Sequence, residues 1–214
     1  MNRKPARPEN PSACASIQDA VLLAAEEERT VDSLLFEQNM LENVDLRFLE
    51  FAGCIFRHVQ FSSVSAERVY FSNCRFEHCD LSGFTFRDGA AFRLEFFGCR
   101  CAGSVFDRMK IRDVLFSDCQ LNYLTLSDSP MERVDFERCD LTQAMFSASP
   151  QKELSFHQCN LSGAEFSSTP LKGVDLSGNS IDGLLANTDL LRGTIVDLSQ
   201  TPQLLALFGI QVRV

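Results

Sequence analysis

The stretch of sequence that decides the fold runs from residue 111 to residue 170. Written in lines of 20, it reads IRDVLFSDCQLNYLTLSDSP (111–130), MERVDFERCDLTQAMFSASP (131–150) and QKELSFHQCNLSGAEFSSTP (151–170). A bulky residue, most often Phe or Leu, opens nearly every group of five. The same period continues without a slip from Phe36 to Leu191. Of these 32 positions, which we call centres, 31 are apolar and only Gln151 is polar. Hydrophobic residues make up 45% of the chain, so composition alone does not explain the period.

The residue two places before each centre is also selective. It is often small or β-branched, as at Cys79, Val134 and Ala144, and the residue between is often polar, as at Asp135. Two inward residues around one outward residue are typical of a short extended strand. The remaining two positions are rich in Ser, Arg, Asp and Gly, which favour turns. Each five-residue unit therefore predicts a short strand followed by a corner.

The sequence also has a longer period of 20 residues. It is carried by one series of cysteines and one of prolines: Cys79, Cys99, Cys119, Cys139 and Cys159, and Pro130, Pro150 and Pro170. Four units therefore close one coil, and residues 36–191 form eight coils stacked over about 38 Å. An α-helix does not fit, because a spacing of five would scatter the centres around its axis. The predicted fold class is an all-β solenoid.

Four segments carry a family resemblance: CDLSGF (79–84), CDLTQA (139–144), CNLSGA (159–164) and VDLSGN (174–179). They resemble the pentapeptide-repeat family, and the resemblance extends over residues 36–191. It implies a right-handed, four-sided (quadrilateral) β-helix of about eight coils. It also implies that the centre and the residue two before it point inward.

The two ends fall outside the repeat. We expect residues 1–15 to be disordered and residues 16–35 to hold a capping helix, since a solenoid must cover its open ends. Ser16 is the predicted N-cap, and the predicted inner face of the helix consists of Ile17, Val21, Leu22 and Ala25.

Residues 192–214 are the predicted C-terminal cap. Ser199 is expected to cap a short helix, Gly209 to end it, and the tail 210–214 alternates like a strand. The segment resembles the ending through which quinolone-resistance members of the family dimerise, which implies a homodimer. The predicted dimerisation residues are Leu204, Leu205, Phe208, Ile210 and Val212.

Signals of catalysis are missing from the sequence. It has no P-loop, no GxGxxG and no GxSxG, and we expect neither enzymatic activity nor a cofactor. His58 and His78 share one outward column, where two exposed turn residues are favoured over a metal pair. The cysteine column is interpreted as core packing, because a spacing of 20 does not resemble the paired cysteines of zinc sites. Cys14 lies outside the rod and is the expected reactive thiol.

Charge is distributed unevenly over the four sides, which we name the Phe36, Leu41, Leu46 and Phe51 faces after their first centres. Their net charges between residues 36 and 191 are −4, −3, −2 and +1. The predicted acidic edge spans the first two faces and consists of Glu37, Glu77, Asp80, Glu95, Asp118, Asp135, Glu137, Asp140 and Asp175. The predicted basic stripe lies on the Phe51 face and consists of Arg93, Lys110, Arg112, Arg133, Lys152 and Lys172.

The resemblance implies a protein that acts through protein–protein interaction. Some family members resemble duplex DNA in size and charge and bind type II topoisomerases, which opposes quinolones. The specific candidate partner is therefore DNA gyrase or topoisomerase IV. The net charge of residues 36–191 is −8, which is a low charge density for a DNA mimic, because about 38 Å of duplex DNA carries roughly 22 charges.

Two alternatives stay open. One is a general interaction scaffold with an unrelated protein partner, favoured by the mixed charge. The other is nucleic-acid binding through the basic stripe, which the total charge of −9 disfavours because it repels phosphate. No apolar run approaches the ~18 residues of a membrane span, and the start of the chain lacks the apolar stretch of a secretion signal. We expect a cytoplasmic protein that does not contact a membrane.

Overall fold

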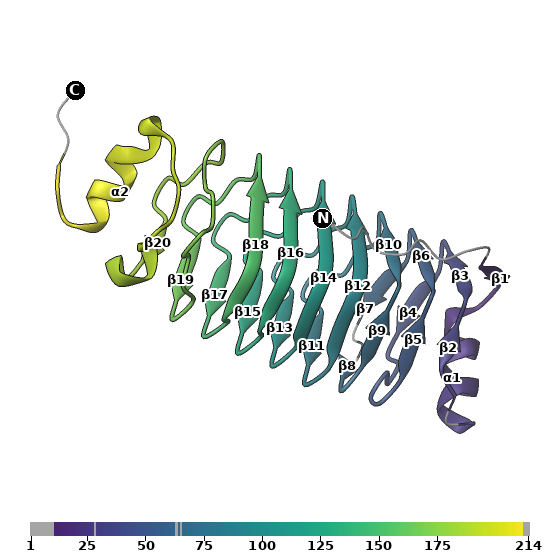
Figure 1. Cartoon of the computed structure of the whole chain (residues 1–214). Helices are drawn as coiled ribbons and strands as arrows, with labels where there is room; N and C mark the ends of the chain where they lie inside the picture. Colours follow the sequence, from purple (N-terminus) through teal and green to yellow (C-terminus); the bar gives the residue numbers. More distant parts are fainter. Residues whose placement is uncertain (1–10, 28, 63, 65, 212–214) are drawn as a thin grey trace.

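The protein is a β-solenoid of about nine turns, drawn out into a rod with a helix near each end (Figure 1). The structure is a computed structural model that describes residues 11–27, 29–62, 64 and 66–211. The predicted fold class is confirmed. The predicted eight coils are exceeded because the winding starts before Phe36 and continues past Leu191: Val31 pairs with Phe51, and Ile195 pairs with Asp175.

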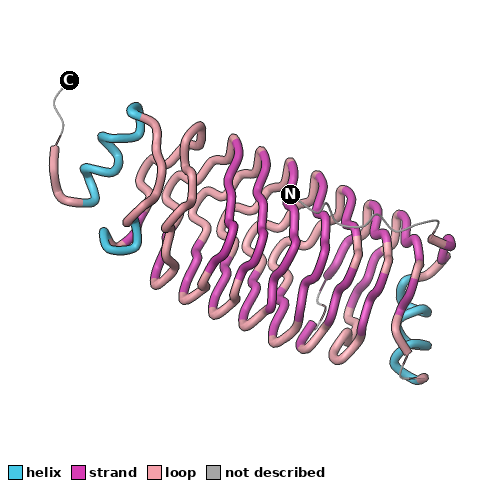
Figure 2. Tube along the Cα trace, in the orientation of Figure 1, coloured by secondary structure: helices cyan, strands magenta, loops and turns pink. Residues whose placement is uncertain are grey.

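All strand pairings of the described residues are parallel and join one coil to the next. Figure 2 shows the strands of successive coils side by side along the rod. An 11-stranded sheet covers the Phe36 and Phe51 faces and contains β1 (Ser12–Cys14), β2 (Val31–Asp32), β3 (Leu34–Glu37), β5 (Glu50–Ala52), β6 (Ile55–Arg57), β9 (Tyr70–Ser72), β10 (Arg75–Glu77), β12 (Ala90–Phe97), β14 (Lys110–Ser117), β16 (Met131–Glu137) and β18 (Gln151–His157). A seven-stranded sheet forms the Leu46 face and contains β8 (Ala66–Glu67), β11 (Thr85–Arg87), β13 (Val105–Asp107), β15 (Thr125–Ser127), β17 (Met145–Ser147), β19 (Glu165–Ser167) and β20 (Leu185–Ala186). The Leu41 face holds β4 (Met40–Glu42) and β7 (Gln60–Ser62), and isolated bridges continue it.

Many corners of the coil use left-handed backbone at the second residue after a centre. His58, His78 and Gly98 follow one another on such a column, with φ of 52°, 53° and 60°. Each of their N–H groups donates to a carbonyl of the next coil, for example His78 to the Phe97 carbonyl at 2.8 Å. These inter-coil bonds offset the strain that a non-glycine residue carries at positive φ.

The core follows the five-residue register. Every predicted centre is buried except Gln151, Ala186 and Leu191, which are half-buried. Phe rings from successive coils stack nearly parallel: Phe76 and Phe96 have centroids 4.7 Å apart, and Phe96 and Phe116 have centroids 4.6 Å apart. The predicted inward assignment is therefore confirmed, and the stacking adds to the free energy gained from burying the rings.

The proline column of the Phe51 face is stabilised by hydroxyl groups. A proline cannot donate a hydrogen bond to the previous coil, so Pro130 and Pro150 interrupt the backbone pattern there. The residues before them compensate. Ser129 Oγ accepts from the Met109 N–H at 2.9 Å, and Ser149 Oγ accepts from the Ser129 N–H at 3.1 Å. Both serines are fully buried, so their hydroxyls carry the inter-coil contact in place of water.

The N-terminal cap is α1 (Ile17–Glu26), and Ser16 is its N-cap as predicted: Ser16 Oγ accepts from the Asp19 N–H at 3.1 Å. The buried face consists of Ile17, Val21 and Ala24. The prediction that Leu22 and Ala25 lie on this face is wrong: both are exposed, Leu22 at 52%. Positions i, i+4 and i+7 face the first coil, and Leu22 lies about 100° further around the helix than Val21.

The expected disorder of residues 1–15 does not hold for Ser12–Cys14. These residues form β1, which pairs with β3, and the Ser12 N–H donates to the Ser33 carbonyl at 2.9 Å. Strand β1 thus covers an edge of the sheet that the first coil would leave open. Residues 1–10 lie outside the described part of the chain.

The C-terminal cap consists of η1 (Thr188–Leu191), η2 (Leu198–Gln200) and α2 (Thr201–Leu207). Ser199 lies inside η2, so its predicted capping role is wrong. Gln200 instead precedes α2, and its buried amide donates to the carbonyls of Leu176 and Asn179 at 2.8 Å, which fastens the helix to the last coil. Gly209 ends the helix with φ of 72°, as predicted. Among the described residues, neither α1 nor α2 has the length and apolar surface that a membrane-spanning helix needs.

A charge placed inside the phenylalanine stack should unfold the rod. Phe116 is 4% exposed, so Phe116→Asp removes a stacked ring and buries a carboxylate, and we expect a loss of more than ~3 kcal/mol in the free energy of unfolding. Chemical denaturation followed by circular dichroism measures this loss. Met145→Asp, at an outward position of β17, is the matched control. Equal stability of the two variants would show that the inward assignment is wrong.

Candidate interaction surface

The outer surface of the rod is the candidate site, because its interior is packed with side chains. Among the described residues, no three His, Cys, Asp or Glu side chains are grouped so that they could hold a metal ion. One surface hollow of about 470 Å³ lies between α1 and the corner at Arg47–Glu50, and another of about 250 Å³ lies beside Arg133 and His157. In the second hollow the Ser155 hydroxyl donates to the Asp135 carboxylate, which is a contact between adjacent coils.

Five of the nine acids of the predicted acidic edge are ion-paired by bases of the same face. Arg57 lies between Glu37 and Glu77, with N–O distances of 3.2 and 2.7 Å. Arg75 lies between Glu77 and Glu95, at 2.7 and 3.6 Å. The three carboxylates and two guanidinium groups form one network across neighbouring coils. They do not form a free acidic surface.

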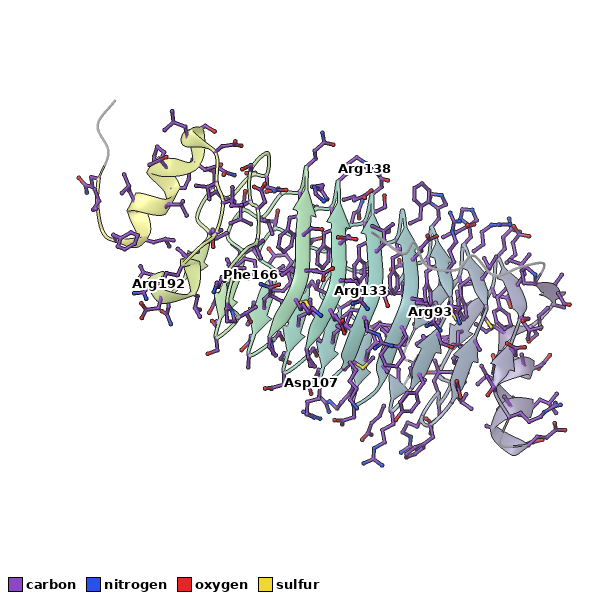
Figure 3. The ribbon with its side chains drawn as sticks, in the orientation of Figure 1. Arg93, Asp107, Arg133, Arg138, Phe166 and Arg192 are labelled. Carbon is purple, nitrogen blue, oxygen red and sulfur yellow. The ribbon has the colours of Figure 1, made fainter. Side chains whose placement is uncertain are left out.

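The same pairing recurs further along the Phe36 face. Arg138, which is labelled in Figure 3, lies 2.7 Å from Asp118 and 3.6 Å from Glu137. Its guanidinium holds the pKa of the Asp118 carboxyl below the ordinary value. The net charge of this face is therefore less available to a partner than its sum suggests.

The other four acids, Asp80, Asp135, Asp140 and Asp175, contact no base at ion-pair distance among the described residues. Asp80 Oδ1 accepts from the Ser82 N–H at 3.0 Å, and Asp175 Oδ1 accepts from the Ser177 N–H at 2.9 Å. Asp140 accepts from both the N–H and the hydroxyl of Thr142. Each of these three carboxylates stabilises the turn that follows it, and hydrogen bonds from Ser177 lower the pKa of Asp175. Asp135 accepts from the Ser155 hydroxyl.

The predicted basic stripe is also partly paired. Arg133 lies 2.5 Å from Asp113, lowers the pKa of that carboxyl and also contacts Glu132. Lys152 lies 3.6 Å from Glu132. Arg112 lies 3.7 Å from Asp113, with its guanidinium 5.2 Å from the centre of the Phe92 ring.

Three cations of the stripe, Arg93, Lys110 and Lys172, have no carboxylate at ion-pair distance in the described part of the chain. Arg93 donates to the side-chain oxygen of Asn73 at 2.5 Å. Arg93 and Arg133 are labelled in Figure 3. The stripe is thus a mixed surface with separate free cations and does not form a continuous basic track.

Sequence reasoning missed a charge network on the Leu46 face. Asp107 accepts from Arg87 at 3.0 Å and from Arg108 at 2.8 Å, and Arg108 also lies 2.6 Å from Asp88 (Figure 3 labels Asp107). The signal was present in the sequence: Arg87 and Asp107, like Asp88 and Arg108, stand 20 residues apart and so meet on adjacent coils.

The two histidines of the outward column stack as the coil map predicts. The rings of His58 and His78 have centroids 5.3 Å apart and an interplanar angle of 14°. His78 also meets the edge of Phe97. Parallel rings do not direct their nitrogens toward a common point, so the geometry favours exposed turn residues over a metal pair.

The predicted dimerisation residues divide into two groups. Leu204 packs against the core of its own chain, and Leu205 is half-buried. Phe208 and Ile210 are exposed, at 59% and 50%, and Val212 lies outside the described residues.

Sequence reasoning did not single out the other exposed apolar side chains at the C-terminal end. They are Leu185, Ile195 and Leu198, of which Leu198 is 89% exposed. Leu198 is not a centre of the five-residue register, and this could have marked it as outward-facing.

Comparison with known proteins agrees with this geometry. A family model described as a pentapeptide repeat region matches residues 69–146, and one described as pentapeptide repeats (8 copies) matches residues 41–77 and 152–178. Together they cover more than half of the chain. No curated protein matches the sequence significantly.

Two solved structures show partial similarity to the protein. A trypsin-treated form of QnrB1, a plasmid-mediated fluoroquinolone resistance protein, is 23% identical with a TM-score of 0.49, and the match covers 86% of this chain and 92% of that one. HetL, a pentapeptide repeat protein involved in heterocyst differentiation regulation from the cyanobacterium Nostoc sp. strain PCC 7120, is 12% identical with a TM-score of 0.41, over 81% and 92% of the two chains. The two matching family models and the unbroken five-residue register show that the chain belongs to the pentapeptide-repeat family.

Proposed function

We propose that the protein acts by binding a protein partner along the side of its rod and that it catalyses no reaction. The observation that carries this proposal is the fixed array of outward side chains, repeated at every coil and held by ion pairs between coils, such as Arg57 with Glu37 and Glu77. Side chains that are already ordered lose little entropy on binding. A rigid, repeated surface of this kind supports recognition of a macromolecule.

The specific partner that we propose is a type II topoisomerase, DNA gyrase or topoisomerase IV, bound in place of DNA and so protected from quinolones. The Leu41 face favours this candidate. Its charged residues between 36 and 191 are Glu42, Asp80, Asp140 and Asp182 against the single base Arg100. In the described part of the chain none of these carboxylates is ion-paired. This face therefore keeps its negative charge, whereas the charge of the Phe36 face is largely paired.

A general scaffold with an unrelated protein partner is the second candidate. The paired networks on the Phe36, Leu46 and Phe51 faces favour it, because alternating charges complement a mixed protein surface better than a phosphate-binding groove. Homodimerisation through the C-terminal end is compatible with both candidates.

Removing charge from the Leu41 face should weaken topoisomerase binding. The double variant Asp80→Asn and Asp140→Asn should keep the fold, since Asn160 makes the same turn contact by accepting from the Ser162 N–H at 3.1 Å. A gyrase supercoiling assay with and without a quinolone measures the effect. We expect the parent to affect gyrase at micromolar concentration. The variant should be at least ~10-fold less potent, which corresponds to a loss of about 1.4 kcal/mol in binding free energy.

The matched control removes two carboxylates from the Leu46 face, Glu67→Gln and Asp128→Asn, and should behave like the parent. No effect of the parent protein on gyrase or topoisomerase IV contradicts the topoisomerase proposal. In that case, a pull-down that recovers an unrelated protein with the parent, but not with the Leu46-face control variant, would favour the scaffold.

Charge at the C-terminal end should dissociate the proposed dimer. Leu198 and Phe208 are exposed there, so Leu198→Asp with Phe208→Asp should convert a dimer to a monomer in sedimentation velocity. Leu22→Asp with Leu23→Asp, at exposed positions of α1, is the control and should leave the dimer intact. A parent protein that is monomeric at high concentration would contradict the proposal.

A further inference from the structure

Five of the six cysteines of the Leu41 face form a straight column of thiols inside the rod; the sixth, Cys101, is a centre of the same face. Cys79, Cys99, Cys119, Cys139 and Cys159 are all buried and all free. Their coils are held in strict register: the Arg100 N–H donates to the Cys79 carbonyl and the Gln120 N–H donates to the Cys99 carbonyl, both at 2.9 Å. The same contact repeats along the column.

All five thiols have the same orientation. The Sγ of each cysteine lies near the carbonyl of the centre 23 residues earlier, as for Cys99 with Phe76 and Cys119 with Phe96, both at 3.4 Å. Cys79, Cys139 and Cys159 repeat this contact at 3.3–3.4 Å. Identical orientations in successive coils place successive sulfurs one coil rise apart, about 4.8 Å.

This spacing suits a metal ion better than a disulfide. A disulfide needs Cβ atoms about 3.8 Å apart, whereas parallel side chains on successive coils keep the Cβ atoms about 4.8 Å apart. An ion midway between two sulfurs would lie roughly 2.4 Å from each, which is close to the ~2.3 Å of a zinc–thiolate bond. The sulfurs lie in line along the rod axis, so each pair of neighbours offers linear coordination.

We propose that neighbouring thiols of this column bind a soft divalent metal ion of the Hg(II) type in linear two-coordinate sites. On binding, two S–H bonds break and two sulfur–metal bonds form. Two protons leave to solvent, and no electron is transferred.

Charge decides which ion fits. A divalent ion with two thiolates is neutral, which suits a site among apolar side chains. Cu(I) with two thiolates would leave a buried negative charge, which is costly. Zn(II) takes four ligands, and the described residues offer no group of three. Metal binding also breaks the S–H hydrogen bonds to the backbone carbonyls, and this costs little free energy because these bonds are weak.

A shorter column on the neighbouring face has the same geometry. Cys54 Sγ lies 3.3 Å from the Val31 carbonyl, and Cys74 Sγ lies 3.5 Å from the Phe51 carbonyl. This pair is a second site of the same class and must be removed when the long column is tested. Cys14 and Cys101 must be removed as well.

The test compares two variants that lose the same number of thiols. In a background of Cys14→Ser, Cys54→Val, Cys74→Val and Cys101→Leu, the interrupted variant carries Cys99→Val and Cys139→Val, which leaves three thiols on alternate coils. The control carries Cys79→Val and Cys99→Val, which leaves Cys119, Cys139 and Cys159 adjacent. Valine is native to the equivalent positions Val59 and Val69. A parallel set of variants replaces the same cysteines with alanine, which is native to the equivalent positions Ala144 and Ala164. This set allows the comparison to be made if a valine variant fails to fold.

Each protein is incubated to equilibrium with mercuric chloride and dialysed, and bound mercury is measured together with its X-ray absorption. We expect the control to retain mercury with two sulfur ligands. We expect the interrupted variant to retain at least ~10-fold less mercury, which corresponds to binding that is weaker by about 1.4 kcal/mol. Its bound mercury should have one sulfur ligand. Zinc chloride should not be retained by either. Equal retention of mercury by the two variants, or a single sulfur ligand in the control, would overturn the proposal.

Discussion

The structure depends on the hydrogen bond that each coil makes to the next at a separation close to 20 residues. Contacts such as the Arg100 N–H to the Cys79 carbonyl recur along the rod and satisfy backbone groups that would otherwise be buried without partners. Because this register is strict, residues 20 apart lie above one another. The stacked Phe76, Phe96 and Phe116, the thiol column and the charge networks are all consequences of that one constraint.

Much of the fold could be predicted from the five-residue period, because burial is decided within each unit. The centres behave as predicted, with Gln151 the only polar one. The ends were harder, because no repeat constrains them. Leu22 and Leu23 are apolar yet exposed, Ser12–Cys14 add a strand that has no sequence pattern, and Gln200 rather than Ser199 precedes α2. In each case contact with the terminal coil decides the outcome over local propensity.

The candidate surface was only partly predictable from the sums of charge on each face. Such sums place residues on the correct side but do not say which charges meet. Arg57 and Arg138 pair the acids of the Phe36 face, whereas the carboxylates of Asp80 and Asp140 are hydrogen-bonded into turns and keep their charge. Side-chain length and the direction of each corner decide these contacts, and neither is encoded in the period. The family defines a rigid surface, and the ion pairs determine how much charge that surface offers.

The most direct test of the 20-residue register is the stability of two internal deletions. Removing residues 131–150 takes out one full coil and brings Phe156 onto Phe116, so the shortened rod should unfold cooperatively and keep its β-sheet circular dichroism. Removing residues 131–152 leaves a coil that is two residues short, which puts the polar residues Glu153 and Gln158 in the places of the centres Met131 and Phe136. We expect this second protein to lose cooperative unfolding. Equal stability of the two deletions in chemical denaturation would contradict the account.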